Sequence, residues 1–167
     1  MTIGIGLLGL GTVGAGVAQI LSTPQGRHPL VGSLALRRVA VRDLARPRPL
    51  ALDASLLTTD PEAVVDDPAV DIVVEVMGGL EPARSLILRA IAAGKPVVTA
   101  NKAVIARYGE EIAAAAAARG VYVLIEAAVG GGIPIIEPLK QSLGANRISR
   151  VSGIINGTTN YILSRMA

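Results

Sequence analysis

The stretch Ile3-Gly4-Ile5-Gly6-Leu7-Leu8-Gly9-Leu10-Gly11-Thr12-Val13-Gly14 decides the fold of this 167-residue chain. Residues 3–8 have the length and apolar character of a buried strand, and residues 13–21 carry apolar side chains along one helical face. The glycines between them follow the pattern G-x-G-x-x-G, which after a strand and before a helix is typical of a dinucleotide-binding loop. The alternative is a glycine turn that binds no ligand.

Each glycine of the pattern has a physical role. Gly9 permits the tight turn, Gly11 has no side chain to block a pyrophosphate, and Gly14 lets the helix pack close to the strand. The free N–H groups at the helix N-terminus would face the anion. We therefore predict that this loop binds the phosphates of a cofactor.

Apolar runs of strand length then alternate with helical patterns. We expect a helix that starts at Asp60-Pro61-Glu62, because Asp is a good N-cap and proline suits the first turn, and an irregular segment over 43–57. Further strands are predicted at 34–41, 72–76, 97–99 and 121–126, and further helices at 81–93 and 109–119. This order predicts an α/β fold, a Rossmann-like doubly wound parallel sheet with helices on both faces, over residues 1–126.

The pattern changes after Glu126, where we expect a second domain to begin over residues 127–167. Three glycines at 130–132 precede a predicted helix at 135–143 and a predicted strand at 147–155. Asn156-Gly157-Thr158-Thr159 then opens a last amphipathic helix. That helix runs into Ala167 without a cap, which predicts a truncated chain.

Composition excludes several classes of function. The absence of cysteine excludes a disulfide scaffold, a thiolate zinc site and a thiol nucleophile, and it fits a reducing cytoplasm. A single histidine, His28, excludes a histidine-based triad. The net charge of +3 comes from scattered basic residues with few aromatics, so we expect no nucleic-acid partner. Residues 1–26 are uncharged, but their glycines would make a poor helix, so we expect no membrane segment.

The second predicted strand ends at Val41-Arg42-Asp43, where a cofactor's adenosine ribose would lie. An acid here would bind the 2′-hydroxyl of NAD, and an arginine would bind the 2′-phosphate of NADP. Arg42, followed by Arg46 and Arg48, favours NADP, although Arg46 and Arg48 fit solvated loop charges equally well.

A third cluster, Thr99-Ala100-Asn101-Lys102, follows a predicted strand at the edge where ligands of such sheets bind. Lys102 there could neutralise a phosphate, or polarise a carbonyl as hydride arrives. The alternative is a solvated surface charge.

Four segments of the chain resemble the homoserine dehydrogenase family. They are Val73-Val74-Glu75-Val76-Met77-Gly78-Gly79, the run Ala93 to Ala103 (AGKPVVTANKA), the run Glu126 to Ile136 (EAAVGGGIPII) and the run Gly153 to Leu163 (GIINGTTNYIL). The resemblance is collinear over essentially the whole chain, and the last two motifs are highly specific.

The resemblance implies an oxidoreductase that interconverts homoserine and aspartate 4-semialdehyde with NAD(P)(H), in threonine, methionine and isoleucine biosynthesis. It implies a cofactor site at Gly9, Leu10, Gly11, Thr12, Val13, Gly14, Arg42, Gly78, Gly79, Thr99 and Lys102, and substrate contacts from Gly157 and Thr158. It also implies a monovalent cation, sodium, at Glu126 and the backbone of Val129, Gly131 and Ile133. Residues 127–167 would then start a substrate-binding and dimerisation domain, and the full-length form would be a homodimer.

The chain departs from this family at its end. Members continue into a sheet that supplies acidic substrate ligands and the lysine usually assigned as proton donor, so that donor is expected beyond Ala167. Lys102 is the internal catalytic candidate, and we expect these residues alone to bind cofactor but to catalyse the reaction poorly.

One alternative function is that of a Rossmann enzyme of the glucose–fructose oxidoreductase kind. In that group Glu-Lys-Pro is expected at the position where this chain has Asn101-Lys102-Ala103. The other is a nucleotide-binding module without chemistry.

Overall fold

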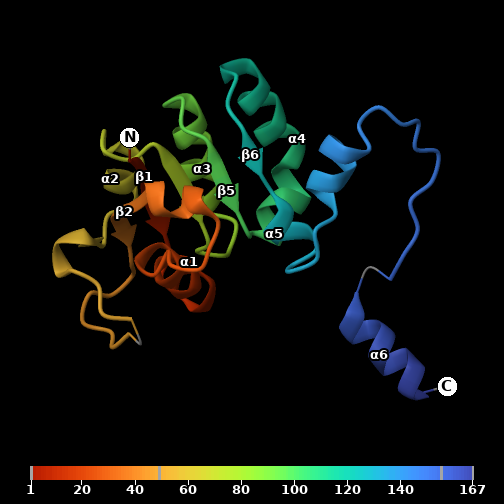
Figure 1. Cartoon of the computed structure of the whole chain (residues 1–167), viewed down its shortest axis with the longest axis horizontal. Coiled ribbons are helices and arrows are strands. Elements are labelled where there is room, and N and C mark those ends of the chain that lie inside the picture. The colour runs from red at the N-terminus through yellow and green to blue at the C-terminus, as the bar shows by residue number, and fades with distance from the viewer. Residues whose placement is uncertain (1, 49, 155, 167) are drawn as a thin grey trace. The chain divides into compact units, whose positions relative to one another are not determined.

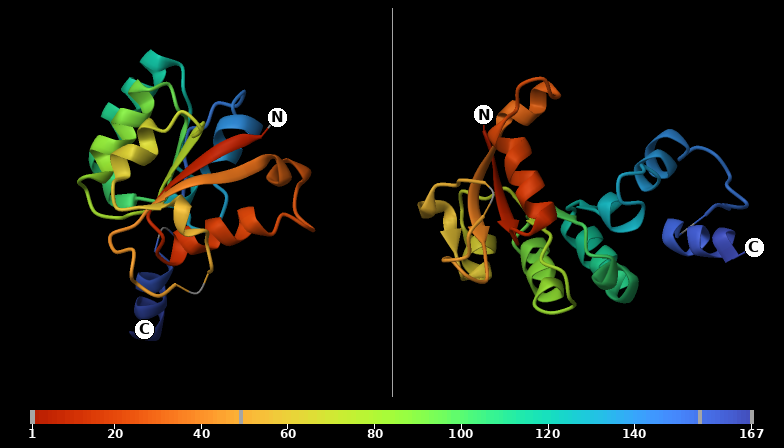
Figure 2. Two further views of the ribbon diagram at one scale, coloured as in Figure 1. Left: turned by 90° about the vertical axis from the view of Figure 1, so that its left-hand side faces the viewer. Right: turned by 90° about the horizontal axis from the view of Figure 1, so that it is seen from below.

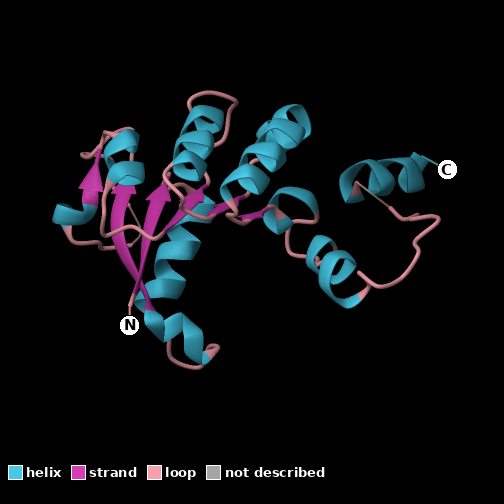
Figure 3. Ribbon diagram, turned by 90° about the horizontal axis from the view of Figure 1, so that it is seen from above, coloured by secondary structure: helices cyan, strands magenta, loops and turns pink. Residues whose placement is uncertain are grey.

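A computed structural model describes residues 2–48, 50–154 and 156–166. Its centre is a parallel sheet of six strands in the order β3-β2-β1-β4-β5-β6 (Figures 1 and 3). The strands are β1 (Ile3–Leu8), β2 (Leu34–Ala40), β3 (Leu57–Thr58), β4 (Ile72–Glu75), β5 (Val97–Thr99) and β6 (Val123–Leu124). The Rossmann-like doubly wound fold expected from the sequence is confirmed.

Helices cover both faces of this sheet (Figure 2, left). Helix α1 (Thr12–Ser22) packs on one face, and α2 (Pro61–Asp66), α3 (Ala83–Ala92) and α4 (Lys102–Arg119) pack on the other. Two short 3₁₀ helices, η1 (Pro29–Ser33) and η2 (Ala54–Leu56), lie in the connections around β2. This layering follows from right-handed crossovers between parallel strands.

The central strands are apolar on both faces because each face is covered. Leu7 and Val39 pack against α1, whereas Leu8, Val73 and Val97 pack beneath α2, α3 and α4. All five side chains are fully buried. Each such side chain contributes about 1.5–3 kcal/mol of hydrophobic stabilisation, so the core fixes the strand ends that form the site.

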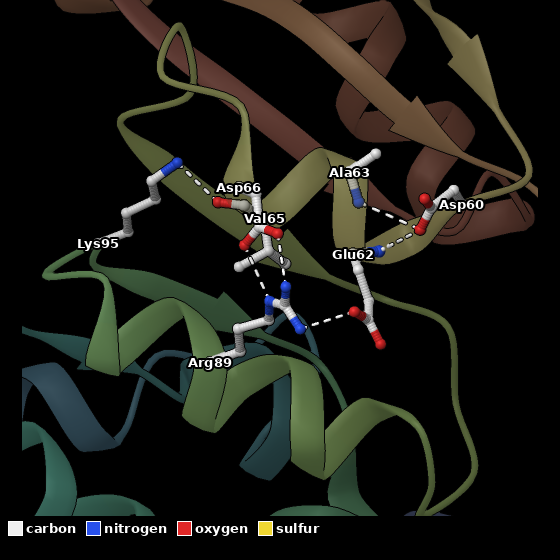
Figure 4. A network of polar contacts seen from close by, with 7 residues as sticks. All are labelled: Asp60, Glu62, Ala63, Val65, Asp66, Arg89 and Lys95. Atoms are coloured by element: carbon white, nitrogen blue, oxygen red, sulfur yellow. Dashed lines mark hydrogen bonds and ion pairs between the residues drawn. The ribbon is translucent and has the colours of Figure 1, made fainter.

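Charged side chains join α2 to α3 outside this core (Figure 4). Arg89 on α3 contacts both carboxylate oxygens of Asp66, at 2.8 and 2.6 Å, and Glu62 at 2.6 Å. The Lys95 ammonium donates to the carbonyl oxygens of Val65 (2.6 Å) and Asp67 (2.7 Å), at the end of α2. These contacts hold α2 against α3 and against the segment that leads into β5.

Several local predictions are confirmed. The strands at 3–8 and 97–99 have the expected bounds. Asp60 caps α2 by accepting from the amides of Glu62 (2.9 Å) and Ala63 (3.2 Å), and Gly120 ends α4 in the left-handed region with a φ of 65°. The irregular segment predicted over 43–57 runs into the short strand β3, whose two residues pair with the end of β2.

Two boundaries in the second half of the sheet differ from expectation. Helix α4 begins at Lys102 rather than near Gly109, because the Asn101 side chain accepts from the Val104 amide and caps the helix. The predicted strand at 121–126 is shorter, and Glu126 instead begins the short helix α5 (Glu126–Val129). Lys102 and Glu126 are therefore each the first residue of a helix.

The chain divides into two compact units, Met1–Ile136 and Glu137–Ala167. In the second unit, the helix predicted at 135–143 is reduced to a short helical segment with a π-helical turn at Pro138–Ser142. The strand predicted at 147–155 was wrong for residues 147–154, which are exposed and pair with no strand in the described chain; Ile155 lies outside the described residues. A lone strand leaves its backbone groups without partners. The last helix, α6 (Gly157–Met166), forms as expected.

Candidate cofactor site

The candidate site lies where the strand order reverses direction. β1 has β2 on one side and β4 on the other, so the connections after β1 and β4 diverge and leave a crevice at their carboxyl ends. The Gly9 amide donates to the Ala40 carbonyl (3.0 Å), and the Val76 amide donates to the Leu8 carbonyl (2.9 Å). These bonds carry the sheet pairing to the rim of the crevice and fix the start of both loops.

The glycine loop has the geometry that its pattern predicts. Gly9 has a φ of 102°, which side chains disfavour, and a Cβ at Gly14 would lie 2.1 Å from the Gly9 carbonyl oxygen. A Cβ at Gly11, in contrast, would meet no atom within 4 Å. Gly11 is also the N-cap of α1 and provides no side-chain hydrogen bond to the first amides. The loop therefore offers open space and helix N–H groups, which suit a pyrophosphate.

A cleft with a volume of about 550 Å³ opens beside this loop. Its wall is formed by residues of the glycine loop, of the segment after β2 and of the segment after β4. Five of the predicted cofactor residues line this cleft: Gly9, Leu10, Gly11, Arg42 and Gly78. Other residues that line it include Asp43, Arg46, Arg48, Glu81 and Pro82. The structure thus brings residues from three separate predicted motifs to one cavity.

The three arginines of the cleft differ in their contacts. Arg48 folds back onto its own loop, where its guanidinium donates to the carbonyls of Leu44, Arg46 and Asp43. The Asp43 carboxylate is likewise engaged, since it accepts from the Ala45 amide at 2.8 Å. Within the described residues, the exposed side chains of Arg42 and Arg46 make no hydrogen bond or ion pair. Two guanidinium groups therefore remain available to an anionic ligand.

The other end of the cleft carries a carboxylate. Hydrogen bonds from Ser85 lower the pKa of Glu81, and Arg84 lowers it further. Arg84 in turn contacts Glu111 on α4 and lies 4.8 Å from the ring centre of Tyr108. Glu81 is thus ionised at neutral pH, and its charge is paired with that of Arg84.

The remaining predicted cofactor residues lie around the cleft. Thr12 and Val13 are exposed in the first turn of α1, and Gly14 is buried behind them. Gly79 is exposed beside Gly78, and both have a positive φ. Thr99 ends β5 at the same edge of the sheet as the glycine loop, but its side chain is fully buried. Lys102 follows as the exposed first residue of α4.

The sequence reasoning missed a buried polar cluster next to these residues. Glu75, Thr99 and Asn101 are the polar or charged side chains buried in the described chain, and they contact one another at the ends of β4 and β5. A signal was present, because Glu75 is a charged residue within the apolar run 72–76.

The predicted cation ligands lie in α5, at Glu126 and Val129, and in the loop that follows it, at Gly131 and Ile133. The Glu126 carboxylate accepts from the amides of Ile135 (2.5 Å) and Ile136 (3.0 Å), so the loop closes on this side chain. A Cβ at Gly130 would lie 2.3 Å from the Ile133 carbonyl oxygen, so that oxygen lies directly over the glycine backbone. Among described residues no group of three His, Asp or Glu side chains could hold a metal ion. One carboxylate with backbone carbonyls is a donor set that suits a hard monovalent cation.

The predicted substrate residues belong to the second unit. Gly157 and Thr158 form the first turn of α6, where the Asn156 side chain accepts from the Thr159 amide at 2.8 Å. Both residues are exposed. Their proposed contact with substrate stays a prediction.

Comparisons with known proteins agree on one family. Residues 9–126 match the family model described as homoserine dehydrogenase, NAD binding domain, and residues 134–167 match the model described as homoserine dehydrogenase. The chain is 68% identical over 166 residues to a homoserine dehydrogenase of Synechocystis, covering 99% of this chain and 38% of that protein. It is 46% identical to that of Corynebacterium glutamicum, covering 98% and 37%.

A solved structure gives the same result. The crystal structure of a homoserine dehydrogenase from Thiobacillus denitrificans superposes with a TM-score of 0.86 at 53% identity, covering 99% of this chain and 39% of that one. The chain therefore spans just under two fifths of the length of these relatives. None of the described helices is both long and apolar enough to cross a membrane.

Proposed function

The chain belongs to the homoserine dehydrogenase family, and on that premise we propose that it supplies the cofactor half of an enzyme that interconverts L-homoserine and L-aspartate 4-semialdehyde. The observation that supports this most strongly is the cleft itself, with open space at Gly11 and the unpaired Arg42 guanidinium on one wall. The reaction belongs to threonine, methionine and isoleucine biosynthesis. A cytoplasmic location fits a chain without cysteine.

We propose NADP as the preferred cofactor. The Asp43 carboxylate that would bind a ribose 2′-hydroxyl is held by its own loop, whereas the Arg42 guanidinium has no partner in the described chain. An arginine can bind a 2′-phosphate with two parallel charged hydrogen bonds. Bound nicotinamide supplies hydride transfer at the carbon that is alcohol in homoserine and aldehyde in the semialdehyde.

The residues of this chain would bind and orient the reactants. The amides at the start of α1 hold the pyrophosphate, and Gly78 and Gly79 leave room for the nicotinamide half. Lys102, at the positive end of α4, would polarise the substrate carbonyl or neutralise the developing charge. Proton transfer to the alkoxide needs a group within hydrogen-bond reach, and the family resemblance assigns that task to a lysine beyond Ala167.

Residues 127–167 would begin the substrate-binding and dimerisation domain. Glu126, with the carbonyls of Val129, Gly131 and Ile133, would hold a sodium ion, and Gly157 and Thr158 would approach the amino-acid substrate. We propose a homodimer for the full-length form. No observation favours an enzyme of the glucose–fructose oxidoreductase kind or a module without chemistry.

A chimaera tests the proposed reaction. Residues 1–167 replace the matching segment of the Synechocystis relative, and homoserine oxidation is followed by the absorbance of the reduced nicotinamide. The proposal predicts turnover with NADP and a large loss of kcat in the Lys102→Ala version. A folded chimaera that binds NADPH but oxidises no homoserine would contradict the proposed reaction.

A further inference from the structure

Glu75 is a charged side chain in the core of the structure, and the family resemblance assigns it no function. It ends β4, and its exposed fraction is zero. Oε2 accepts from the Thr99 hydroxyl at 2.7 Å, and Oε1 accepts from the Met77 amide at 2.9 Å and from Asn101 Nδ2 at 3.5 Å. A carboxylate placed here costs much more than an apolar side chain unless its hydrogen bonds are satisfied.

Every partner of this carboxylate is a donor. The Thr99 hydroxyl oxygen accepts from the backbone N–H of Asn101 at 3.0 Å, so the hydroxyl proton points to Glu75. A carboxylate satisfies these donors at both oxygens. A glutamine of the same shape has one acceptor oxygen in place of two, so at least one donor of the cluster would lose its acceptor.

The cluster joins three segments of backbone through these bonds. Asn101 Nδ2 also donates to the Gly79 carbonyl at 2.8 Å, while Asn101 Oδ1 accepts from the Val104 amide and caps α4. Glu75 thereby ties the turn at 77–79, the end of β5 and the start of α4 to one buried point. Gly78, Gly79, Thr99 and Lys102 all lie on these segments.

We propose that Glu75 is a positioning residue for the nicotinamide half of the bound cofactor, an inference that rests on the proposed function. A dinucleotide lies across the reversal in strand order, with one half on each side of β1. Arg42 follows β2 and takes the adenosine half, which leaves the nicotinamide half to the ends of β4 and β5. The segments that Glu75 ties together form that second side.

The two halves can be probed separately. Adenosine 2′,5′-bisphosphate carries the adenosine and 2′-phosphate of NADP without the nicotinamide. In Glu75→Gln we expect the dissociation constant for NADPH to rise about tenfold, and that for adenosine 2′,5′-bisphosphate to stay within about twofold. NADPH binding is followed by nicotinamide fluorescence, and the bisphosphate by calorimetry. A loss of fold would weaken both ligands together.

A second variant tests the same inference if Glu75→Gln does not fold. Asn101→Ser keeps an N-cap for α4 but is too short to reach both Gly79 and Glu75, and we expect it to show the same selective loss. The control is Asp71→Asn, which removes a carboxylate that accepts from the Gly4 amide at the amino end of the sheet. The control lowers the melting temperature and leaves the ratio of the two affinities unchanged.

The outcomes separate this inference from the proposed function. An unchanged NADPH affinity in folded Glu75→Gln or in Asn101→Ser would overturn the positioning role, as would an equal loss for both ligands. A wild-type chain that is folded but binds neither ligand would instead overturn the proposed cofactor site. If Glu75→Gln does not fold, the affinity ratio of Asn101→Ser decides.

Discussion

The backbone of Gly14 lies so close to the carbonyl oxygen of Gly9 that a Cβ on Gly14 would be only 2.1 Å from that oxygen. This contact presses the start of α1 against the end of β1. The fold therefore requires glycine at position 14, whereas Gly11 has open space around it. The two requirements, packing and ligand access, can therefore be tested independently.

Alanine at Gly14 should destabilise the fold, and alanine at Gly11 should block the cofactor. We expect Gly14→Ala to cost about 1–3 kcal/mol of unfolding free energy, because the extra methyl forces the backbone apart. Gly11→Ala should keep its melting temperature close to that of the wild type and lose roughly tenfold or more in NADPH affinity, because its methyl points into the pyrophosphate space. Thermal unfolding and a fluorescence titration measure the two effects.

Gly16→Ala is the matched control for both. It lies within α1, and its Cβ would also meet no atom within 4 Å. We expect a gain of about 0.5–1 kcal/mol in stability from the better helix former, with unchanged NADPH affinity. Full cofactor affinity in Gly11→Ala would refute the assigned pyrophosphate position.

Removal of the Arg42 guanidinium should change cofactor preference. We expect Arg42→Ala to weaken NADPH by about ten- to a hundredfold, since one charged hydrogen bond contributes about 1.5–3 kcal/mol, and to leave NADH almost unchanged. Arg48→Ala is the comparison, because Arg48 contacts its own backbone. Equal losses for the two cofactors in Arg42→Ala would show that Arg42 does not bind the 2′-phosphate.

The ion pair between α2 and α3 should make stability depend on acid pH. The Arg89 hydrogen bonds lower the pKa of Asp66 below its ordinary 3.8, so the folded chain holds this proton less tightly than the unfolded chain. The pair therefore adds stability above pH 3.8, and that stability is lost as the pH falls through the lower folded value. The melting temperature of Arg89→Gln should fall less steeply over this acid range than that of the wild type.

The control for this slope is Arg46→Gln, which removes an exposed arginine that contacts no carboxylate in the described chain. Its melting temperature should follow the wild-type curve. Identical acid slopes for Arg89→Gln and the wild type would mean that the pair contributes nothing measurable, as many exposed pairs do.

The second unit should make the chain self-associate. Ile154, Tyr161, Ile162 and Leu163 are each at least half exposed, which is unusual for large apolar side chains gathered in one short segment. We expect a sedimentation coefficient that rises with concentration, and a smaller rise in Leu163→Glu. A monomer at every concentration would contradict this expectation.

Much of the fold could be predicted because its main elements are locally encoded. The strand at 3–8 is buried almost throughout and contains no charged or polar side chain, and the strand at 97–99 begins with two valines. The start of α4 was missed because the glycine at 109 suggested a boundary, whereas the decisive signal was the cap at Asn101. The strand expected at 147–155 failed because its apolar residues have no neighbouring strand in the described chain.

The site was predictable to a smaller extent. The G-x-G-x-x-G loop and Arg42 are short motifs whose context fixes their place, and both line the cleft. The Glu75 cluster depends on contacts between residues 24 and 26 positions apart. Such contacts form only when β4 and β5 pair, so no local pattern specifies them.

Calorimetric titration of NADPH into the chain measures whether this cleft binds a nicotinamide dinucleotide. We expect saturable binding at one site per chain, which adenosine 2′,5′-bisphosphate competes away and Gly11→Ala weakens. A folded chain that gives no binding heat with NADPH, or that binds it without competition from the bisphosphate, would contradict the assignment of this cleft to a nicotinamide dinucleotide.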